Sequence, residues 1–379
     1  MKKIYRFSDY SFFTDMSELA RKNNSFDLSL GLPDFDIDER LKYYLKESAE
    51  CDVHQYEPLA GSPMLIQHII RFNAQRKNSI IINENEISII PCATFALHTA
   101  LKSVLKPGDE VVIIQPSYYT YGPSVVMNGG IPVYYEPEPD FSTNWDQLKS
   151  CISSKTKAVI VNSPQNPTGK VWNQSDWNQL YHLISDRNIY LISEEIYDLY
   201  CYDGAEHYSS FLHPELKKKT FCIFSFGKMF HCTGWKVSYM LAPEDLTAQF
   251  RFHQQYLSYG ANAPAQYALA KYLHGFDFEQ HQSVMQHKRD LFNTLIAETP
   301  LETDHPCEGS VFQTINFRNV SKTMTDVEFS QWLTAEKQVA CLPLSAFYHL
   351  RQNSDYIRFS FLKKDETIIQ ALEHLKRVL

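Results

Sequence analysis

The sequence predicts an α/β protein in which a mostly parallel sheet lies between helices and is followed by a smaller α+β domain. In the middle of the chain, short β-branched or apolar runs alternate with helical patterns, which is typical of repeated βαβ units. The hydrophobic pattern of residues 250–290 predicts long helices. After Gly309 the pattern predicts short strands and a final amphipathic helix. The 379 residues favour two domains, or one large α/β domain with an appendage, because a domain holds roughly 100–200 residues.

Four runs are the clearest strand candidates, because each is short, apolar or β-branched and ends at polar, Gly or Pro residues. They are residues 111–115, 158–162, 190–193 and 221–224. Helical patterns lie between them at residues 94–105 and 175–185, and the second opens with Ser and Asp, which favour a helix start. Strands that alternate with helices in this way predict a parallel sheet covered on both faces.

The C-terminal third predicts the second domain. Its helical sequence pattern is interrupted at Gly275, because glycine disfavours a helix interior. Residues 366–378 are predicted to form the final amphipathic helix. The chain shows no internal repeat, low-complexity tract or Pro/Gly/Ser linker. We therefore expect the two parts to pack together rather than to be tethered.

Composition and charge exclude several classes of protein. Hydrophobic residues make up 44% and charged residues 21%, close to the average for soluble globular proteins. The net charge is -8 and the Lys and Arg residues are scattered, so no nucleic-acid partner is expected. The eight cysteines form no C-x-x-C pair or regular spacing, which argues against a disulfide framework and against a metal site.

The N-terminus has the positive start of a signal peptide but no apolar run behind it. No later segment reaches the ~18 uncharged apolar residues that a membrane span needs. We therefore expect a cytoplasmic protein with no membrane partner.

A lysine stands in the most chemically suggestive segment, which follows the fourth predicted strand. Residues 225–236 read Ser-Phe-Gly-Lys-Met-Phe-His-Cys-Thr-Gly-Trp-Lys. Ligands of open parallel sheets bind beyond the carboxyl ends of the strands, where this segment begins. Apolar neighbours would partly desolvate Lys228 and favour its neutral, nucleophilic form. On its own, a surface lysine with its ammonium in water is the more common case.

Three further motifs follow in a recognisable order. Residues 162–169 read Asn-Ser-Pro-Gln-Asn-Pro-Thr-Gly, residues 194–197 read Glu-Glu-Ile-Tyr, and residues 356–360 read Tyr-Ile-Arg-Phe-Ser. Singly, each could be chance, and Asn-Pro-Thr-Gly could be any turn. Together with Ser225-x-x-Lys228 and Gly234-Trp235-Lys236, they resemble the class I/II aminotransferases, which depend on pyridoxal phosphate and have PLP fold type I.

The resemblance implies a large domain with a mostly parallel seven-stranded sheet between helices, plus a smaller α+β domain. It assigns residues 44–275 to the large cofactor-binding domain and residues 276–379 to the small one. The N-terminal segment, residues 1–43, is expected to contribute to the small domain.

The resemblance also gives catalytic roles. Lys228 would form the Schiff base with pyridoxal 5'-phosphate and then move a proton between the substrate and the cofactor. Glu194 stands where the family has the Asp that keeps the pyridine nitrogen protonated, and it is one methylene longer. The alternative is that Glu194 is an exposed carboxylate at a strand end. Tyr197 and Asn166 match the pair that hydrogen-bonds the phenolic oxygen of the cofactor.

Further residues match the family's cofactor-binding positions. Tyr118 would stack on the pyridine ring, although two other tyrosines lie close by. Backbone donors at the start of a helix would hold the phosphate together with a hydroxyl and a cation, although Cys92 stands where the family usually has Gly. These phosphate residues are Ala93, Thr94, Ser225 and Lys236. Tyr56 matches a tyrosine that reaches the phosphate of a neighbouring subunit, which implies a homodimer with shared active sites.

The same resemblance implies which residues contact the substrate. Arg358 would hold the substrate α-carboxylate bidentately, and its alternative is a surface salt bridge on a strand. The Gly31 backbone resembles the segment that closes over the substrate, where Asn166 also contributes. Tyr259 would lean into the pocket of the partner.

The segments at residues 227–236, 253–256, 264–266 and 306–309 look most like the methionine and kynurenine aminotransferase branch. This implies ping-pong transfer of an amino group from methionine, phenylalanine, tyrosine or kynurenine to a 2-oxo acid. Two rival functions stay open: a PLP-dependent C–S β-lyase on the same fold, and a PLP-binding protein without catalytic activity.

Overall fold

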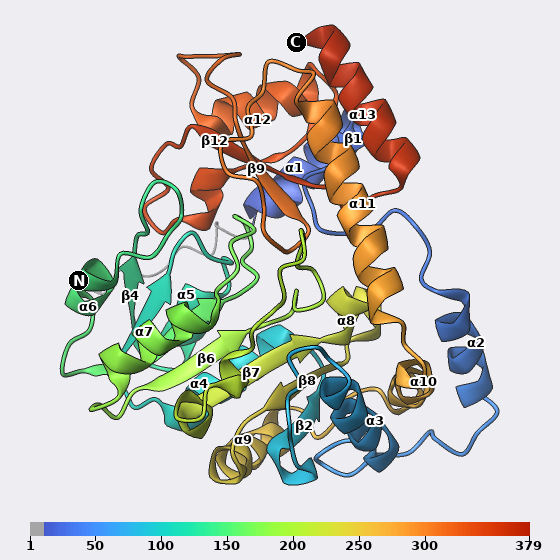
Figure 1. Ribbon diagram of the computed structural model, residues 1–379, viewed down its shortest axis with the longest axis vertical. Coiled ribbons are helices and arrows are strands. Elements are labelled where there is room, and N and C mark those ends of the chain that lie inside the picture. The colour runs from blue at the N-terminus through green and yellow to red at the C-terminus, as the bar shows by residue number, and fades with distance from the viewer. Residues whose placement is uncertain (1–10) are drawn as a thin grey trace.

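A seven-stranded sheet forms the centre of the computed structural model, which describes residues 11–379 (Figure 1). The strand order is β2-β8-β7-β6-β5-β3-β4. The strands are β2 (Ile87–Ile90), β3 (Glu110–Ile114), β4 (Ile131–Tyr135), β5 (Thr156–Asn162), β6 (Tyr190–Glu194), β7 (Thr220–Ser225) and β8 (Ser238–Leu241). β3 to β7 are parallel to their neighbours among these five strands, whereas β8 is antiparallel to both β7 and β2. This confirms the predicted mostly parallel sheet.

The four predicted strands correspond to β3, β5, β6 and β7, with ends shifted by one or two residues. Successive side chains of a strand point to opposite faces of the sheet. In β3, Val111 and Ile113 join one hydrophobic core, and Val112 and Ile114 join another on the other face. The runs are apolar throughout because both faces of the sheet are covered.

Helices cover both faces of the sheet. The core that contains Val111 includes residues of α4 (Ala93–Val104), α5 (Tyr121–Met127) and α9 (Glu244–Leu257). The opposite core includes residues of α6 (Trp145–Ser150) and α7 (Gln174–Ile184). Residues of α3 (Pro63–Ala74) and α10 (Ala263–Leu273) form a third core with β2 and β8. The predicted helices at residues 94–105 and 175–185 are therefore confirmed as α4 and α7.

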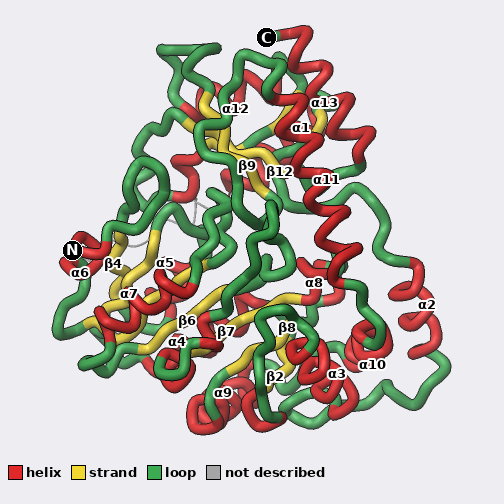
Figure 2. The backbone as a smooth tube through the Cα atoms, in the orientation of Figure 1, coloured by secondary structure: helices red, strands yellow, loops and turns green. Residues whose placement is uncertain are grey.

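The remaining C-terminal elements lie above the sheet in Figure 1, and Figure 2 shows their mixture of helices and strands. β9 (Phe312–Asn316), β12 (Tyr356–Ser360) and β11 (Leu342–Pro343) form an antiparallel sheet. The helices are α11 (Phe278–Ile296), α12 (Asp326–Ala335) and α13 (Asp365–Val378). Gly275 separates α10 from α11 with φ +81°, in the left-handed region that glycine adopts without strain. The predicted final helix is confirmed as α13.

The N-terminal segment joins the C-terminal elements. β1 (Phe26–Asp27) pairs with β10 (Val339–Ala340), and α1 (Ser11–Lys22) packs against α12. The chain then passes to α2 (Glu39–Ser48), which packs against α10. The first ten residues of the predicted segment 1–43 lie outside the described residues.

Two glycines let the 162–169 loop pack against the C-terminal part. The Gly169 carbonyl oxygen accepts hydrogen bonds from the backbone N–H of Glu308 at 3.0 Å and of Gly309 at 2.8 Å. A Cβ at Gly309 would lie 2.5 Å from the Tyr200 carbonyl oxygen, and a Cβ at Gly169 would overlap Cys307. Side chains at these positions would therefore separate the segments that enclose the site.

No helix among residues 11–379 is long and apolar enough to cross a lipid bilayer. Within the same residues, no group of three or more His, Cys, Asp and Glu side chains could hold a metal ion. The eight cysteines are free thiols.

Candidate active site

The carboxyl ends of β5, β6 and β7 bring polar residues to one edge of the sheet. Asn162 lies beside Glu194 in the strand register, and Ser225 ends the next strand. A cavity of about 370 Å³ opens at this edge. Eleven of the predicted site residues line it: Gly31, Ala93, Thr94, Tyr118, Asn166, Glu194, Tyr197, Ser225, Lys228, Lys236 and Arg358. Residues far apart in sequence are thus gathered around one space.

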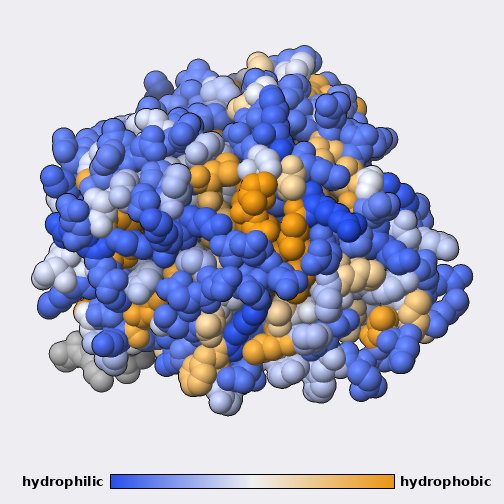
Figure 3. All heavy atoms as spheres, turned by 60° about the horizontal axis from the view of Figure 1, so that its bottom comes forward, coloured by the Kyte–Doolittle hydropathy of each residue, from blue (hydrophilic) through white to orange (hydrophobic). Residues whose placement is uncertain are grey.

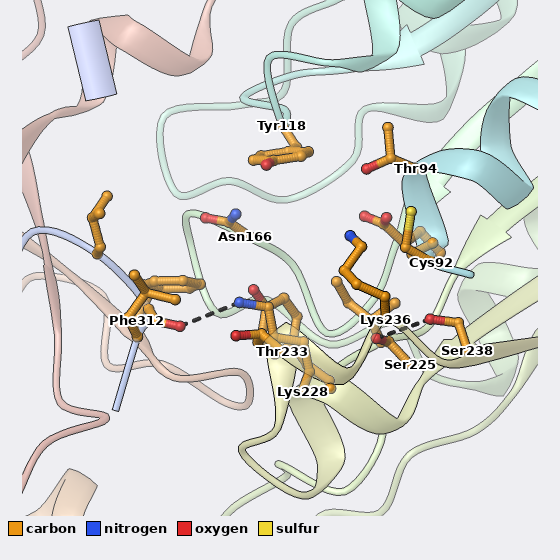
Figure 4. A pocket seen from close by; sticks show the side chains of 18 of the residues that line it. Cys92, Thr94, Tyr118, Asn166, Ser225, Lys228, Thr233, Lys236, Ser238 and Phe312 are labelled. Carbon is orange, nitrogen blue, oxygen red and sulfur yellow. Dashed lines mark hydrogen bonds between the residues drawn. The ribbon is translucent and has the colours of Figure 1, made fainter. Parts of the chain in front are cut away.

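Lys228 reaches this cavity from α8 (Phe226–Met229), a single turn directly after β7. Its Nζ donates a hydrogen bond to the Gly31 carbonyl oxygen at 3.2 Å (Figure 4). The pKa of Lys228 is lowered to about 8, chiefly by burial and also by the charges of Arg358 and Lys236, while the charge of Glu194 acts against the change. A larger share of the amine is therefore neutral near pH 8 than in an ordinary lysine, as attack on an aldehyde requires.

Glu194 ends β6 and is only 5% exposed, so the alternative of an exposed carboxylate at the strand end is wrong. The Tyr121 hydroxyl donates a hydrogen bond to Glu194 Oε2. Burial raises the pKa of Glu194 to about 7, while the hydrogen bond from Tyr121 and the charge of Lys228 act against this rise. The hydrogen bond and the nearby ammonium favour the ionised carboxylate, which is the form that can pair with a protonated ring nitrogen.

One side of the cavity suits a phosphate. α4 begins there, and its N-cap residue Cys92 makes no side-chain capping hydrogen bond, which leaves the first backbone donors available. Figure 4 shows Cys92, Thr94, Lys236 and Ser225 together on this side. The Ser238 hydroxyl donates a hydrogen bond to Ser225 Oγ at 3.2 Å. Helix N–H groups, a hydroxyl and a cation together favour an anion.

The Tyr118 ring lies over the cavity, as Figure 4 shows, where a flat ring system could stack on it. Asn166 points into the same space, and its Oδ1 accepts a hydrogen bond from Arg358 Nη1 at 2.8 Å. The side-chain nitrogen of Asn166 is then left as a donor. Tyr197 is buried, which raises the pKa of its phenol and keeps it protonated as a second donor.

Arg358 stands in the middle of β12 and is 2% exposed, so the alternative of a surface salt bridge is wrong. Its Nη2 donates to the Ser29 carbonyl oxygen, and its guanidinium carbon lies 4.0 Å from the centre of the Phe312 ring. Its buried Nε has no hydrogen-bond partner among the described residues. Burial lowers the pKa of Arg358 to about 9, which leaves it charged at neutral pH. A fixed cation without a carboxylate partner suits an anionic substrate group.

These residues fit pyridoxal phosphate. The group needs an amine for its aldehyde, a cradle for its phosphate, an acidic partner for its ring nitrogen and a surface for its ring. Lys228, the start of α4, Glu194 and Tyr118 supply one each from the walls of the same cavity.

Two of the predicted residues, Tyr56 and Tyr259, do not line the cavity of this chain. They are 86% and 47% exposed, and their ring centres lie 5.5 Å apart.

Sequence reasoning missed Tyr121 as the partner of Glu194, and it missed the apolar wall of the cavity. The wall residues are Phe13, Leu30, Leu32, Tyr119 and Phe312. The Tyr-rich run at residues 118–121 was the one available signal for Tyr121. Four of the wall residues come from the N-terminal segment and β9, where no motif marks them, and Tyr119 belongs to the Tyr-rich run before α5.

The comparisons with known proteins agree with this geometry. The family model described as aminotransferase class I and II matches residues 23–375. A methionine aminotransferase from Escherichia coli (strain K12) is 36% identical over 97% of this chain and 95% of that protein. An aspartate aminotransferase from Pyrococcus abyssi is 32% identical over 93% and 91%. Human kynurenine–oxoglutarate transaminase 3 is 28% identical over 97% and 88%.

A solved structure gives the same result for the fold. The crystal structure of an Escherichia coli protein with a methionine aminotransferase function matches with a TM-score of 0.93 and 35% identity, and the match covers 97% of each chain. The matches confirm the resemblance that the motifs indicated and the predicted fold.

The lowered pKa of Lys228 predicts when its amine reacts. In the PLP-free protein, acylation of Lys228 should rise with a midpoint near pH 8, well below the ~10.4 of an exposed lysine. Arg358→Gln should move the midpoint upward, because it removes a positive charge that disfavours the ammonium. Mass spectrometry of the peptide that carries Lys228, labelled across a pH series, measures both values. A midpoint near 10 in the unchanged protein would contradict this environment.

Proposed function

The chain belongs to the class I and II aminotransferases, and from this premise we propose that it transfers the amino group of methionine or an aromatic amino acid to a 2-oxo acid. Its cofactor is pyridoxal phosphate, which draws electrons away from the substrate Cα when it is bound. The observation that carries the proposal is that Lys228 and Arg358 line one cavity beside an anion cradle.

Lys228 is the proton carrier in this proposal. Because its pKa is lowered to about 8, the amine of Lys228 could take the proton from the substrate Cα and carry it on Nζ until it is delivered within the same cavity. When the cofactor is bound, Glu194 would pair with its protonated ring nitrogen, and Asn166 and Tyr197 would donate hydrogen bonds to its phenolic oxygen. Oriented groups of this kind stabilise charge without reorganisation during the reaction.

Arg358 binds the substrate carboxylate. Asn166 and the Ser29 carbonyl hold the two ends of the guanidinium, which fixes its plane before the substrate arrives. The Gly31 backbone closes the cavity above Lys228, where a Cβ would lie 2.7 Å from the Phe312 ring. The substrate is thereby held between Arg358 and Lys228 with little access for water.

The proposed preference for amino acids with apolar side chains follows from the small number of positively charged residues in the cavity and from its apolar wall. Three cations line the cavity, namely Lys228, Lys236 and Arg358, and each already has a proposed role. No fourth cation among the lining residues can bind the side-chain carboxylate of aspartate. Phe13, Leu30 and Leu32 instead offer apolar surface. The similarity to a methionine aminotransferase supports this preference, whereas the similarity to the aspartate aminotransferase of Pyrococcus abyssi argues for aspartate as the amino donor.

We further propose a homodimer with shared active sites. Figure 3 shows hydrophobic side chains gathered near the middle of the face that is turned forward there. Several large side chains are also exposed at the end of α9, namely Phe252, Tyr256 and Leu257, and the nearby Tyr259 contacts Tyr56. If a second copy of the chain covers these side chains, Tyr56 of one subunit would reach the phosphate cradle of the other subunit. Tyr259 would in the same way reach the substrate pocket of the other subunit.

The division into residues 1–43, 44–275 and 276–379 stays a prediction, as does a cytoplasmic location.

A donor assay tests the proposed reaction. The PLP-loaded protein should convert methionine and phenylalanine with a kcat/KM about tenfold or more above that for aspartate, because the apolar wall discriminates by roughly 1–3 kcal/mol. Quantification of the 2-oxo acid formed, with a second 2-oxo acid as acceptor, gives the values. Lys228→Ala should abolish turnover, and Lys149→Ala, an exposed lysine on α6, should leave it unchanged.

Other outcomes of this assay point elsewhere. Comparable turnover of aspartate would contradict the proposed donors. Pyruvate and thiol released from cystathionine, without amino transfer, would indicate the C–S β-lyase. A loaded protein that converts no amino acid would indicate the non-catalytic alternative.

Hybrid dimers test the shared site. Tyr56→Phe and Lys228→Ala should each impair their own homodimers, because the first loses a phosphate contact and the second loses the amine. A hybrid of the two should regain one intact site, formed by Lys228 of one subunit and Tyr56 of the other. Titration with PLP, together with light scattering for the mass, measures this recovery. Tyr43→Phe, an exposed tyrosine without an assigned role, is the matched control. A monomer, or a hybrid without recovery, would contradict the proposal.

A further inference from the structure

Position 194 poses a geometric problem that the shorter Asp would not pose. The extra methylene of Glu194 extends its reach by about 1.5 Å and adds a rotatable bond. A carboxylate with more rotamers in a buried site loses orientation, and orientation determines how well it faces a ring nitrogen. Glu194 therefore needs a partner that selects one rotamer.

Tyr121 is that partner. It begins α5, is 2% exposed, and its hydroxyl donates to Oε2 of Glu194. Glu194 lines the cavity, but Tyr121 does not. Because Oε2 accepts from Tyr121, Oε1 is the oxygen left available for a ring nitrogen in the cavity. The Tyr121 hydroxyl thus acts on the site through Glu194.

The turn that carries Tyr121 is itself fixed. The Tyr121 N–H donates to the Tyr118 carbonyl oxygen at 3.2 Å, and the two rings meet edge to face with centres 6.2 Å apart. A Cβ at the next residue, Gly122, would overlap the Tyr134 hydroxyl. One short turn therefore sets both the ring over the cavity and the hydroxyl behind Glu194.

The charges around this pair agree with the direction of the hydrogen bond. Burial raises the pKa of Tyr121 well above its usual value, so the phenol stays protonated and donates. Burial raises the pKa of Glu194 to about 7, and the Tyr121 hydrogen bond and Lys228 oppose that rise. Tyr118 and Tyr197 also face Glu194, and both stay neutral because burial raises their pKa values.

We propose that Tyr121 is a positioning residue that holds the longer Glu194 side chain ionised and aimed at the pyridine nitrogen of the cofactor. This inference rests on the proposed role of Glu194. It has a specific consequence: an Asp at position 194 would end about 1.5 Å short of the Tyr121 hydroxyl, so Tyr121 should matter much less in that background.

A double-mutant cycle on the PLP-reconstituted protein tests the inference. Tyr121→Phe should weaken PLP binding about tenfold, the usual effect of removing a hydrogen bond to a charged group. In the Glu194→Asp background, the same change should weaken binding about twofold or less. PLP dissociation constants and a pH titration of the visible absorbance of the bound cofactor provide the measurements. The titration midpoint should shift with Tyr121→Phe and return toward the original value when Glu194→Asp is added.

A matched control separates this role from a loss of packing. Tyr135→Phe also removes a buried hydroxyl, which accepts from the Asn144 N–H at 2.6 Å and does not line the cavity. It should change neither the dissociation constant nor the titration. Thermal melting without PLP verifies that each variant is folded.

The outcomes distinguish the inference from the function on which it rests. If Glu194→Ala leaves PLP affinity and the absorbance unchanged, the proposed role of Glu194 fails, and the inference fails with it. If Glu194→Ala weakens binding and Tyr121→Phe does not, only the inference fails. Equal effects of Tyr121→Phe in both backgrounds would show a structural role and would also overturn it.

Discussion

The alignment of the parallel strands is the constraint on which the site depends. Because β5, β6 and β7 point the same way, their carboxyl ends meet at one edge, and residues from three distant parts of the sequence become neighbours. Both faces of these strands are covered by helices, so the edge is the place where polar groups can gather without breaking a core. Lys228, Glu194 and the start of α4 all owe their positions to this edge.

The second half of the site comes from segments that close over the sheet. Arg358 on β12 and Gly31 near the N-terminus meet there, and Arg358 itself binds the Ser29 carbonyl. Gly169 and Gly309 allow the backbone of this part to approach the 162–169 loop. Burial then sets the chemistry, because it lowers the pKa of Lys228 to about 8 and raises that of Glu194 to about 7. The lowered pKa of Lys228 suits a group that exchanges a proton, whereas Glu194 keeps its charge only with the help of the Tyr121 hydrogen bond and the nearby Lys228.

The sequence predicted the sheet well because its strands are apolar on both faces and end at polar residues. It also predicted most of the cofactor residues, since they follow strand ends in short motifs. The role of Tyr121 was not predictable, because three tyrosines stand within four residues and only the start of α5 decides which one reaches Glu194. The apolar wall was missed for another reason: Phe13 and Phe312 are far apart in the sequence, and only the folded chain brings both to the same cavity. Tyr56 and Tyr259 were named by resemblance alone, and one chain cannot bring them to its own cavity.

The central claim is that Lys228, at the edge of the sheet, is the residue that carries pyridoxal phosphate. Borohydride reduction of the PLP-loaded protein fixes the cofactor to the lysine that holds it, and peptide mass spectrometry then locates it. We expect one cofactor per chain on the peptide that contains Lys228, and none on Lys236 in the same cavity. Labelling of Lys236 or of surface lysines, with Lys228 unmodified, would contradict this assignment of the cofactor lysine.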